Sequence, residues 1–161
     1  MTSGGAESGG LDLSVFTPYR IAVLGRKMSE QLGVAYSNEG LTIPEWRVLA
    51  VISQQDAVAA RDVVARTPMD KMAVSRAVAS LEAKKLILRE RAEDRRVAAL
   101  KLSPKGKDVF ERVSAIALSY ERALLGAMSG EERRALAAAL ERLESAVKSA
   151  AELKSAKRAA E

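Results

Sequence analysis

The stretch MDKMAVSRAVASLEAK, residues 69–84, decides the fold of this chain. Asp70 is placed to cap a helix that runs from Lys71 to Lys84. Apolar residues recur along this helix at spacings of four and three and give it one buried face: Val74, Val78 and Leu81. The segment before it, residues 60–67, has the pattern of a brief helix that ends at Pro68. Two short helices joined by a tight turn in a basic region have the form of a helix-turn-helix.

The hydrophobic period changes directly after this stretch. Residues 86–91 and 97–102 are two short extended candidates, and the second alternates, with Ala98, Leu100 and Leu102 expected inward. The polar residues 92–96 between them suit the tip of a hairpin loop. The sequence therefore predicts a β-hairpin after the helix-turn-helix.

Further helices are predicted on both sides. Thr42 can cap a helix over residues 43–53, and Glu45 completes a capping box three residues on. An earlier helix follows Pro18 and runs to Asn38, with the apolar stripe Ile21, Leu24, Met28, Leu32 and Tyr36. Ser103-Pro104 starts a fifth helix with Val109, Val113, Ile116, Tyr120 and Leu124. Ser129 and Glu132 form a capping box for a sixth, with Leu136, Leu140, Leu143 and Val147.

The expected fold class is mainly α with a small β-hairpin. Residues 1–12 are rich in glycine and serine and are expected to form a disordered tail, and residues 151–161 a fraying one. No apolar run approaches the roughly 20 residues needed to cross a bilayer. Residues 1–10 also lack the basic start and apolar middle of a secretion signal, so a cytoplasmic protein without membrane contact is expected.

The composition restricts the chemistry that the chain can perform. It contains no cysteine and no histidine, which excludes disulfides and thiolate metal sites and removes the commonest general base. We recognise no phosphate-cradling glycine loop, nucleophile elbow or paired-carboxylate motif. The sequence therefore predicts that the protein is not an enzyme and that it uses no cofactor and no metal.

The positive charge is concentrated in the middle third of the chain. The whole chain has a net charge of +5, whereas residues 61–107 carry 13 basic and 6 acidic side chains, a net charge of +7. Residues 1–60 have a net charge of −2 and residues 108–161 are neutral. A localised excess of this kind favours a polyanion-binding segment over a general solubility device.

The order of these elements, together with three stretches of sequence, resembles the MarR family of winged helix-turn-helix transcription regulators. The resemblance spans about residues 18–147 and rests on residues 41–49 (LTIPEWRVL), residues 69–78 with Leu81-Glu82 after them, and Asp94-Arg95-Arg96 ahead of residues 100–103 (LKLS) and Gly106. It implies one domain over residues 13–150. In that domain residues 42–103 form the DNA-binding winged helix, and residues 13–38 and 104–150 form N- and C-terminal dimerisation helices.

The resemblance also assigns the contacts to double-stranded DNA. The helix over residues 71–84 enters the major groove, which puts five residues of its first turns nearest the bases: Lys71, Met72, Ala73, Ser75 and Arg76. Arg96 at the hairpin tip is expected in the minor groove, with Asp94 orienting it, Arg95 on a phosphate and Arg91 nearby. The alternatives are a plain solvated helix face and a charged loop kept soluble by its own ion pairs.

The chain departs from the family pattern at Lys85, where the family often has glycine in a left-handed helix cap. A non-glycine residue there costs roughly 1 kcal/mol if the conformation is kept. The exit from the helix into the hairpin is therefore a place where this chain can differ from the family.

Dimerisation is expected because one small winged domain cannot cover the apolar stripes of the first, fifth and sixth helices. The resemblance implies a two-fold homodimer on a pseudo-palindromic operator with half-sites about 10 bp apart. It also implies an effector, a small aromatic acid or its CoA thioester, in a cleft between the dimer helices and the winged domain. The candidate ligand residues are Arg20, Met28, Trp46, Arg47 and Tyr120. For Trp46 and Met28 the alternative is plain core packing.

The predicted function is a sequence-specific DNA-binding transcription regulator, with repression released by the effector as the family default. The alternative is an effector-independent architectural DNA-binding protein that uses the same basic face. Such a protein would show a steep salt dependence and little discrimination between sequences. A winged helix used only as a protein-interaction module is a further alternative, against which the +7 segment argues.

Overall fold

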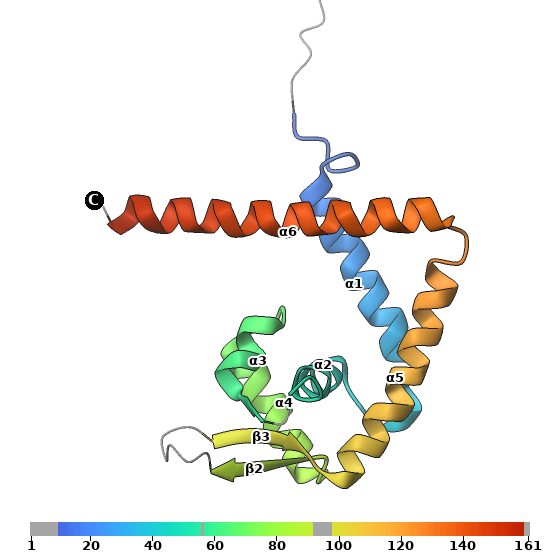
Figure 1. Ribbon diagram of the computed structural model, residues 1–161, viewed down its shortest axis with the longest axis vertical. Coiled ribbons are helices and arrows are strands. Elements are labelled where there is room, and N and C mark those ends of the chain that lie inside the picture. Colours follow the sequence, from blue (N-terminus) through green and yellow to red (C-terminus); the bar gives the residue numbers. More distant parts are fainter. Residues whose placement is uncertain (1–9, 56, 92–97, 160–161) are drawn as a thin grey trace, which may run out of the picture. The chain divides into compact units, whose positions relative to one another are not determined.

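The computed structural model describes residues 10–55, 57–91 and 98–159, with side chains as far as residue 152 except those of residues 91 and 98. The chain divides into two compact units, Met1–Ala117 and Leu118–Glu161. The described elements (Figure 1) are α1 (Thr17–Ala35), the 3-10 helix η1 (Ser37–Glu39), α2 (Ile43–Ile52), β1 (Val58–Ala59), α3 (Ala60–Arg66), α4 (Lys71–Ala83), β2 (Ile87–Arg91), β3 (Ala98–Leu102), α5 (Pro104–Leu124) and α6 (Gly130–Ala159). The predicted fold class is confirmed, with mainly helical structure and a small antiparallel sheet.

Helix α4 is anchored by its apolar face. The Asp70 carboxylate accepts a hydrogen bond from the Ala73 backbone N–H at 2.7 Å, which is the predicted N-cap. The predicted buried face is also confirmed, because its members are fully buried: Val74, Val78 and Leu81. They belong to a core that includes Val63 of α3 and the residues Val48, Leu49 and Ile52 of α2. Each fully buried aliphatic side chain contributes about 1.5–3 kcal/mol, so this packing holds the opposite face of α4 outward.

The sheet has three strands in the order β1-β3-β2, all antiparallel. The predicted hairpin is β2 with β3, where Ile87 pairs with Leu102 and Arg91 with Ala98. Leu100 is buried as expected. Strand β1 was not predicted, because two residues are too few to show an alternating pattern, and it is held by the pairing of Val58 with Leu100.

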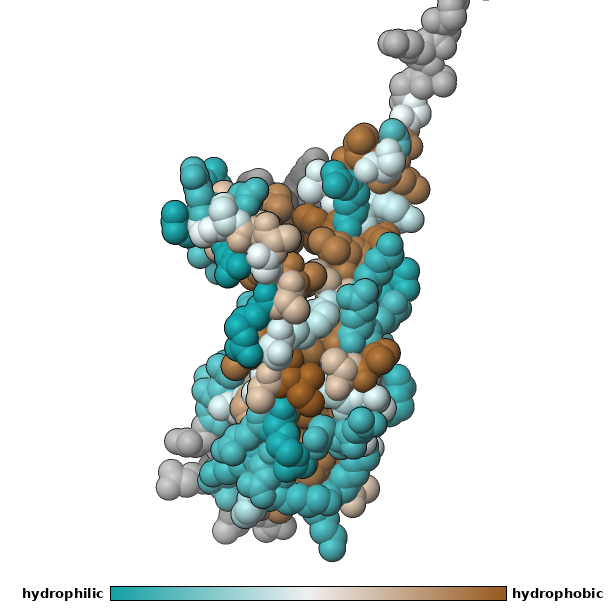
Figure 2. Space-filling model, turned by 90° about the vertical axis from the view of Figure 1, so that its right-hand side faces the viewer, coloured by the Kyte–Doolittle hydropathy of each residue, from teal (hydrophilic) through white to brown (hydrophobic). Residues whose placement is uncertain are grey.

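Helix α1 is only loosely covered by the rest of the chain. It ends at Ala35 rather than at the predicted Asn38, and Tyr36 turns into the core directly after it. No residue of α1 is buried, and several of its apolar side chains or those just before it are exposed: Leu13, Phe16, Tyr19, Ile21 and Leu24. On the face in Figure 2, apolar atoms reach the surface beside this N-terminal segment, whereas hydrophilic side chains cover the lower part of the molecule.

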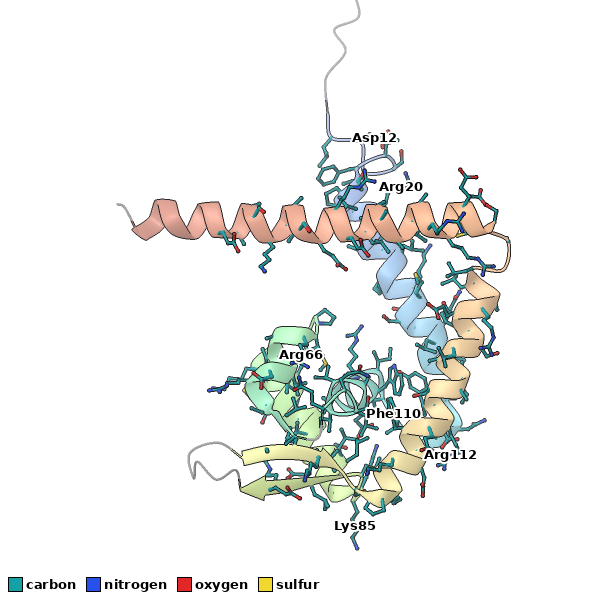
Figure 3. The ribbon with its side chains drawn as sticks, viewed as in Figure 1. Asp12, Arg20, Arg66, Lys85, Phe110 and Arg112 are labelled. Carbon is teal, nitrogen blue, oxygen red and sulfur yellow. The ribbon has the colours of Figure 1, made fainter. Side chains whose placement is uncertain are left out.

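Lys85 ends α4 in the left-handed conformation, with φ of 59°. Its backbone N–H donates to the Glu82 carbonyl, and the Leu86 N–H donates to the Leu81 carbonyl, each at 2.9 Å. This is a Schellman motif, and the two leucines that such a motif brings together, Leu81 and Leu86, are both buried. The exit to the hairpin thus keeps the glycine-type geometry without glycine, while the Lys85 side chain points away from the protein (Figure 3).

The start of α5 is packed tightly onto this turn. The Ser103 hydroxyl donates to the Lys85 carbonyl at 2.7 Å and accepts from the Gly106 N–H at 2.9 Å. A Cβ atom at Gly106 would lie 1.9 Å from the Leu86 carbonyl oxygen. Glycine is therefore required where the first turn of α5 crosses the start of β2.

The second unit contains the end of α5 and the 30-residue helix α6. The predicted capping box is confirmed, because the Ser129 N–H donates to Glu132 at 2.7 Å and the Glu132 N–H donates to Ser129 at 3.2 Å. The predicted apolar stripe of α6 is exposed, from 39% at Leu136 to 71% at Val147. Across the described residues, no helix is long and apolar enough to span a membrane.

Candidate nucleic-acid interface

The outward face of α4 is polar and basic. Lys71, Met72, Ser75 and Arg76 are exposed, with Met72 at 63%, and Ala73 is half-buried. These are the five residues that the sequence analysis put nearest DNA, and the structure brings them together on the first turns of one helix. A single α-helix of this kind fits the major groove of DNA, which is about 12 Å wide.

Two cations on this face have no partner in the described part of the chain. The side chains of Lys71 and Arg76 make no hydrogen bond and no ion pair there, whereas Lys84 is paired with Glu45 and Arg89 with Glu82. A hollow of about 410 Å³ adjoins the same face between α3, α4 and β2, and its lining includes Arg61, Lys71 and Ser75. The unpaired positive charge therefore lies where an external polyanion could approach.

The hairpin carries the other predicted DNA contacts. Arg91 is the last residue of β2, opposite Ala98, and its side chain lies outside the described set. Asp94, Arg95 and Arg96 also lie outside the described residues. Their proposed contacts thus stay predictions.

Arg89 connects the base of the hairpin to α4. Its guanidinium Nη2 donates to Glu82 Oε2 at 3.0 Å, and its Nε donates to the other carboxylate oxygen. The hydrogen bonds to Glu82 raise the pKa of Arg89, although partial burial opposes them. This pair ties the end of α4 to β2, and the sequence analysis did not identify it.

Glu45 has a second role besides the predicted capping box. Glu45 is 2% exposed, and its carboxylate accepts a hydrogen bond from the Thr42 N–H at 2.7 Å, as predicted. It also accepts from the Ser80 hydroxyl at 2.6 Å and from Lys84 Nζ at 2.7 and 2.9 Å, both on α4. Lys84 Nζ donates in addition to the Gly40 carbonyl at 2.7 Å. Glu45 therefore joins the start of α2 to the end of α4.

The electrostatics of this buried carboxylate favour its charged form. Burial raises the pKa of Glu45, but the hydrogen bonds from Lys84, Ser80 and Thr42 outweigh burial and hold the pKa below its usual value. The sequence does contain a signal for this burial, because Glu45 shares a helix face with Val48, Leu49 and Ile52 at spacings of three, four and seven.

A groove of about 500 Å³ lies between α1 and α2, and Arg47 is its candidate anion-binding residue. The guanidinium Nη2 of Arg47 donates to the Ser29 hydroxyl across the groove at 3.1 Å. The remaining lining includes Ile21, Gly25, Ile43 and Pro68. Arg26 and Glu30 also line it and pair with each other at 2.7 Å. A groove with apolar walls and a guanidinium that is not paired with a carboxylate suits a small organic acid.

The structure does not bring the other ligand candidates into this groove. Arg20 lines a separate hollow along α1 with Leu13 and Leu24. Trp46 packs in the core, stacked on Phe110 with ring centroids 5.6 Å apart, and Phe110 points from α5 toward α2 (Figure 3). Met28 is half-buried on α1, and Tyr120 belongs to the second unit.

The central region of the chain matches a family model. Residues 39–97, which include the elements from α2 to β2 but not β3, match the model of the MarR family. No curated protein matches the chain.

Solved structures show the same fold. The chain is similar to a MarR/EmrR family transcriptional regulator from Acinetobacter sp. ADP1, with 28% identity and a TM-score of 0.79 over 86% of this chain and 99% of that one. It is similar to S. aureus MepR in a complex with DNA, with 21% identity and a TM-score of 0.73 over 83% and 98%. It is also similar to Bordetella bronchiseptica BpsR, whose DNA binding is regulated by 6-hydroxynicotinic acid, with 23% identity and a TM-score of 0.71 over 84% and 98%.

Proposed function

We propose that the chain is a DNA-binding transcription regulator of the MarR family, whose model residues 39–97 match, and that it binds one operator sequence as a homodimer and represses transcription until an effector releases it. The proposed role is binding rather than catalysis, and the proposed place of action is the cytoplasm. The observation that carries the proposal is the outward face of α4, whose cations Lys71 and Arg76 have no partner among the described residues.

In this proposal α4 is the recognition helix. Its first turns enter the major groove, where a guanidinium can donate two hydrogen bonds to guanine, a contact that distinguishes it from other bases by about 1–3 kcal/mol. Arg76 is the proposed base-reading residue, and Lys71 and Ser75 are proposed to contact phosphates. Arg96 is proposed to enter the minor groove from the hairpin tip, with Asp94 orienting it and Arg91 and Arg95 on phosphates. The similar fold of MepR, which has been solved with DNA, supports this use of the fold.

The homodimer is proposed from apolar side chains without cover. Exposed leucines and a valine recur along one face of α6, and exposed apolar residues accompany α1. A second copy of the chain would bury both stripes. Contiguous exposed apolar surface of this kind is rare on monomeric proteins and marks an interaction site. A two-fold dimer presents two α4 helices and therefore binds a pseudo-palindrome with half-sites about 10 bp apart.

The proposed effector is a small aromatic acid or its CoA thioester. The groove between α1 and α2 supports this class, because Arg47 can pair with a carboxylate while Ile21 and Ile43 contact the ring. BpsR, a protein of the same fold, responds to a compound of this kind. Calorimetry with benzoate and hydroxycinnamate derivatives and their CoA thioesters tests the class, and no heat of binding from any of them would retire it.

Fluorescence anisotropy tests the DNA-binding proposal. The upstream region of the gene and a scrambled duplex are compared at two salt concentrations, for the wild type, Arg76→Ala, Arg96→Ala and Arg112→Ala. Arg112 is the charge-matched control, because it lies on α5 and pairs with Glu39. We expect a wild-type preference for the upstream duplex that Arg76→Ala reduces about tenfold or more and Arg112→Ala leaves intact. Equal, salt-sensitive binding to both duplexes would instead indicate the architectural alternative.

A further inference from the structure

The contacts between α2 and α4 are of two physical kinds. Most of them are apolar, between Val48, Leu49 and Ile52 on one helix and Val74, Val78 and Leu81 on the other. Packing of such side chains favours a class of crossing angle but leaves a scatter of about 15–20° within it. The hydrogen bonds that Glu45 accepts from Ser80 and Lys84 are directional. They therefore restrict the orientation of α4 on α2 further than the apolar packing does.

These hydrogen bonds lie at the opposite end of α4 from the candidate DNA-reading residues. Ser80 and Lys84 are one turn apart at the end of the helix, and the candidate DNA-reading residues lie on its first turns. A 13-residue helix is about 20 Å long. A small change of tilt at the Glu45 end therefore displaces Lys71 and Arg76 at the other end.

The same carboxylate lies beside the candidate effector groove. Ile43 and Arg47, two residues before and two residues after Glu45, line the groove between α1 and α2. A ligand that shifts the start of α2 would therefore shift Glu45 as well. Because Ser80 and Lys84 donate hydrogen bonds to Glu45, the shift would be transmitted to α4.

We propose that Glu45 is a positioning residue that couples the α1–α2 groove to the recognition helix α4. The inference rests on the proposed function, because it assigns Glu45 a part in DNA recognition without DNA contact. Its partners in the coupling are Ser80 and Lys84, and Thr42 only closes the cap of α2. In one arrangement α4 is aligned for the major groove of DNA, and in the other it is not. The α1–α2 groove and the DNA-binding face both shift the equilibrium between these two states.

The variant Glu45→Gln separates coupling from capping. Its amide oxygen can still accept from the Thr42 N–H, and its amide nitrogen can donate to the Ser80 hydroxyl, but the ion pair with Lys84 is lost because the amide carries no charge. Glu132→Gln is the matched control, because Glu132 on α6 closes the same kind of capping box with the same 2.7 Å bond and has no cross-helix partner within the described part of the chain. Lys84→Met removes the other member of the ion pair, which is more exposed than Glu45, and keeps an unbranched apolar side chain at this position.

Two readouts on the full chain test the coupling. The first is affinity for the upstream duplex relative to the scrambled one, at a temperature where circular dichroism shows every variant folded. The second is the emission of Trp46, the single tryptophan of the chain, which lies next to Glu45 and packs on Phe110 rather than on the outward face of α4. A purely structural role for Glu45 would move neither readout in the folded protein.

We expect Glu45→Gln and Lys84→Met each to lower the affinity for the upstream duplex about tenfold, with unchanged affinity for the scrambled duplex, whereas Glu132→Gln behaves as the wild type. The double variant should bind no more weakly than either single variant. Upstream DNA should change Trp46 emission in the wild type and in Glu132→Gln only. If Glu45→Gln does not fold, Lys84→Met decides the result.

The outcomes separate this inference from the function on which it rests. A wild type that prefers the upstream duplex, with the same preference and the same Trp46 response in Glu45→Gln and Lys84→Met, overturns the coupling alone. A preference without any Trp46 response in the wild type also overturns it. A wild type without preference overturns the proposed function, and the coupling with it.

Discussion

Lys85 occupies a backbone conformation that ordinary L residues enter at a cost of about 1–2 kcal/mol. Glycine would remove this cost but would lose about 0.5–1 kcal/mol through the entropy of the unfolded chain. We therefore expect Lys85→Gly to raise the free energy of unfolding by up to about 1 kcal/mol. Urea titration at one fixed protein concentration measures it, with Lys85→Ala as the control that keeps the strain. A loss of stability in Lys85→Gly would contradict the assignment of strain to this residue.

Gly106 presents the opposite case, a glycine that the packing requires. A methyl group there would overlap the Leu86 carbonyl, which accepts the Ser103 N–H at 3.0 Å. We expect Gly106→Ala to lower the free energy of unfolding by about 2–3 kcal/mol or more, because the α5–β2 junction must open. Gly25→Ala on α1 is the matched control, since a Cβ there meets no atom within 4 Å. Equal stability of the two variants in urea titrations would show that the junction is looser than described.

At the scale of elements, the contact between α2 and α4 makes stability depend on pH. The pKa of Glu45 is lower in the folded protein than its usual 4.5, despite burial, because Lys84, Ser80 and Thr42 donate to the carboxylate. The charged Glu45 carboxylate therefore stabilises the folded protein in full above the pKa that it has in the unfolded chain. This stabilisation is lost as the pH falls through its pKa in the folded protein. We expect the difference in unfolding free energy between the wild type and Glu45→Gln to be constant near neutral pH and to shrink below about pH 4.5. Urea titrations across this range measure it, and a difference that grows toward acid pH would contradict the sign.

The elements that local patterns specify were predictable. Asp70 and the spacing of Val74, Val78 and Leu81 predict α4 and its buried face, and the capping boxes at Thr42 and Ser129 are visible in sequence. Strand β1 could not be predicted, because its identity comes from pairing with β3 about 40 residues away. The pair of Glu45 with Lys84 depends on the same kind of distant contact. Of the candidate site, the exposed face of α4 followed from the buried one, whereas the groove beside Arg47 required the packing of α1 on α2.

At the scale of the whole molecule, the exposed stripe on α6 predicts how copies associate. Leu140 is 44% exposed, and Ser145 lies on the opposite side of the same helix. We expect Leu140→Glu to shift the protein from dimer to monomer at micromolar concentration, because a carboxylate would be buried in the proposed interface, while Ser145→Glu stays dimeric. Light scattering after size exclusion gives the mass. A wild type that is monomeric, or a Leu140→Glu variant that stays dimeric, would rule out this interface.

Hydroxyl-radical footprinting of the upstream DNA reports both the choice of sequence and the geometry of the dimer in one experiment. We expect two protected patches related by two-fold symmetry and about 10 bp apart, which disappear together in Arg76→Ala and persist in Arg112→Ala. Uniform protection along the duplex would show a non-specific architectural protein. A single asymmetric patch would show that this chain does not read DNA as a two-fold dimer.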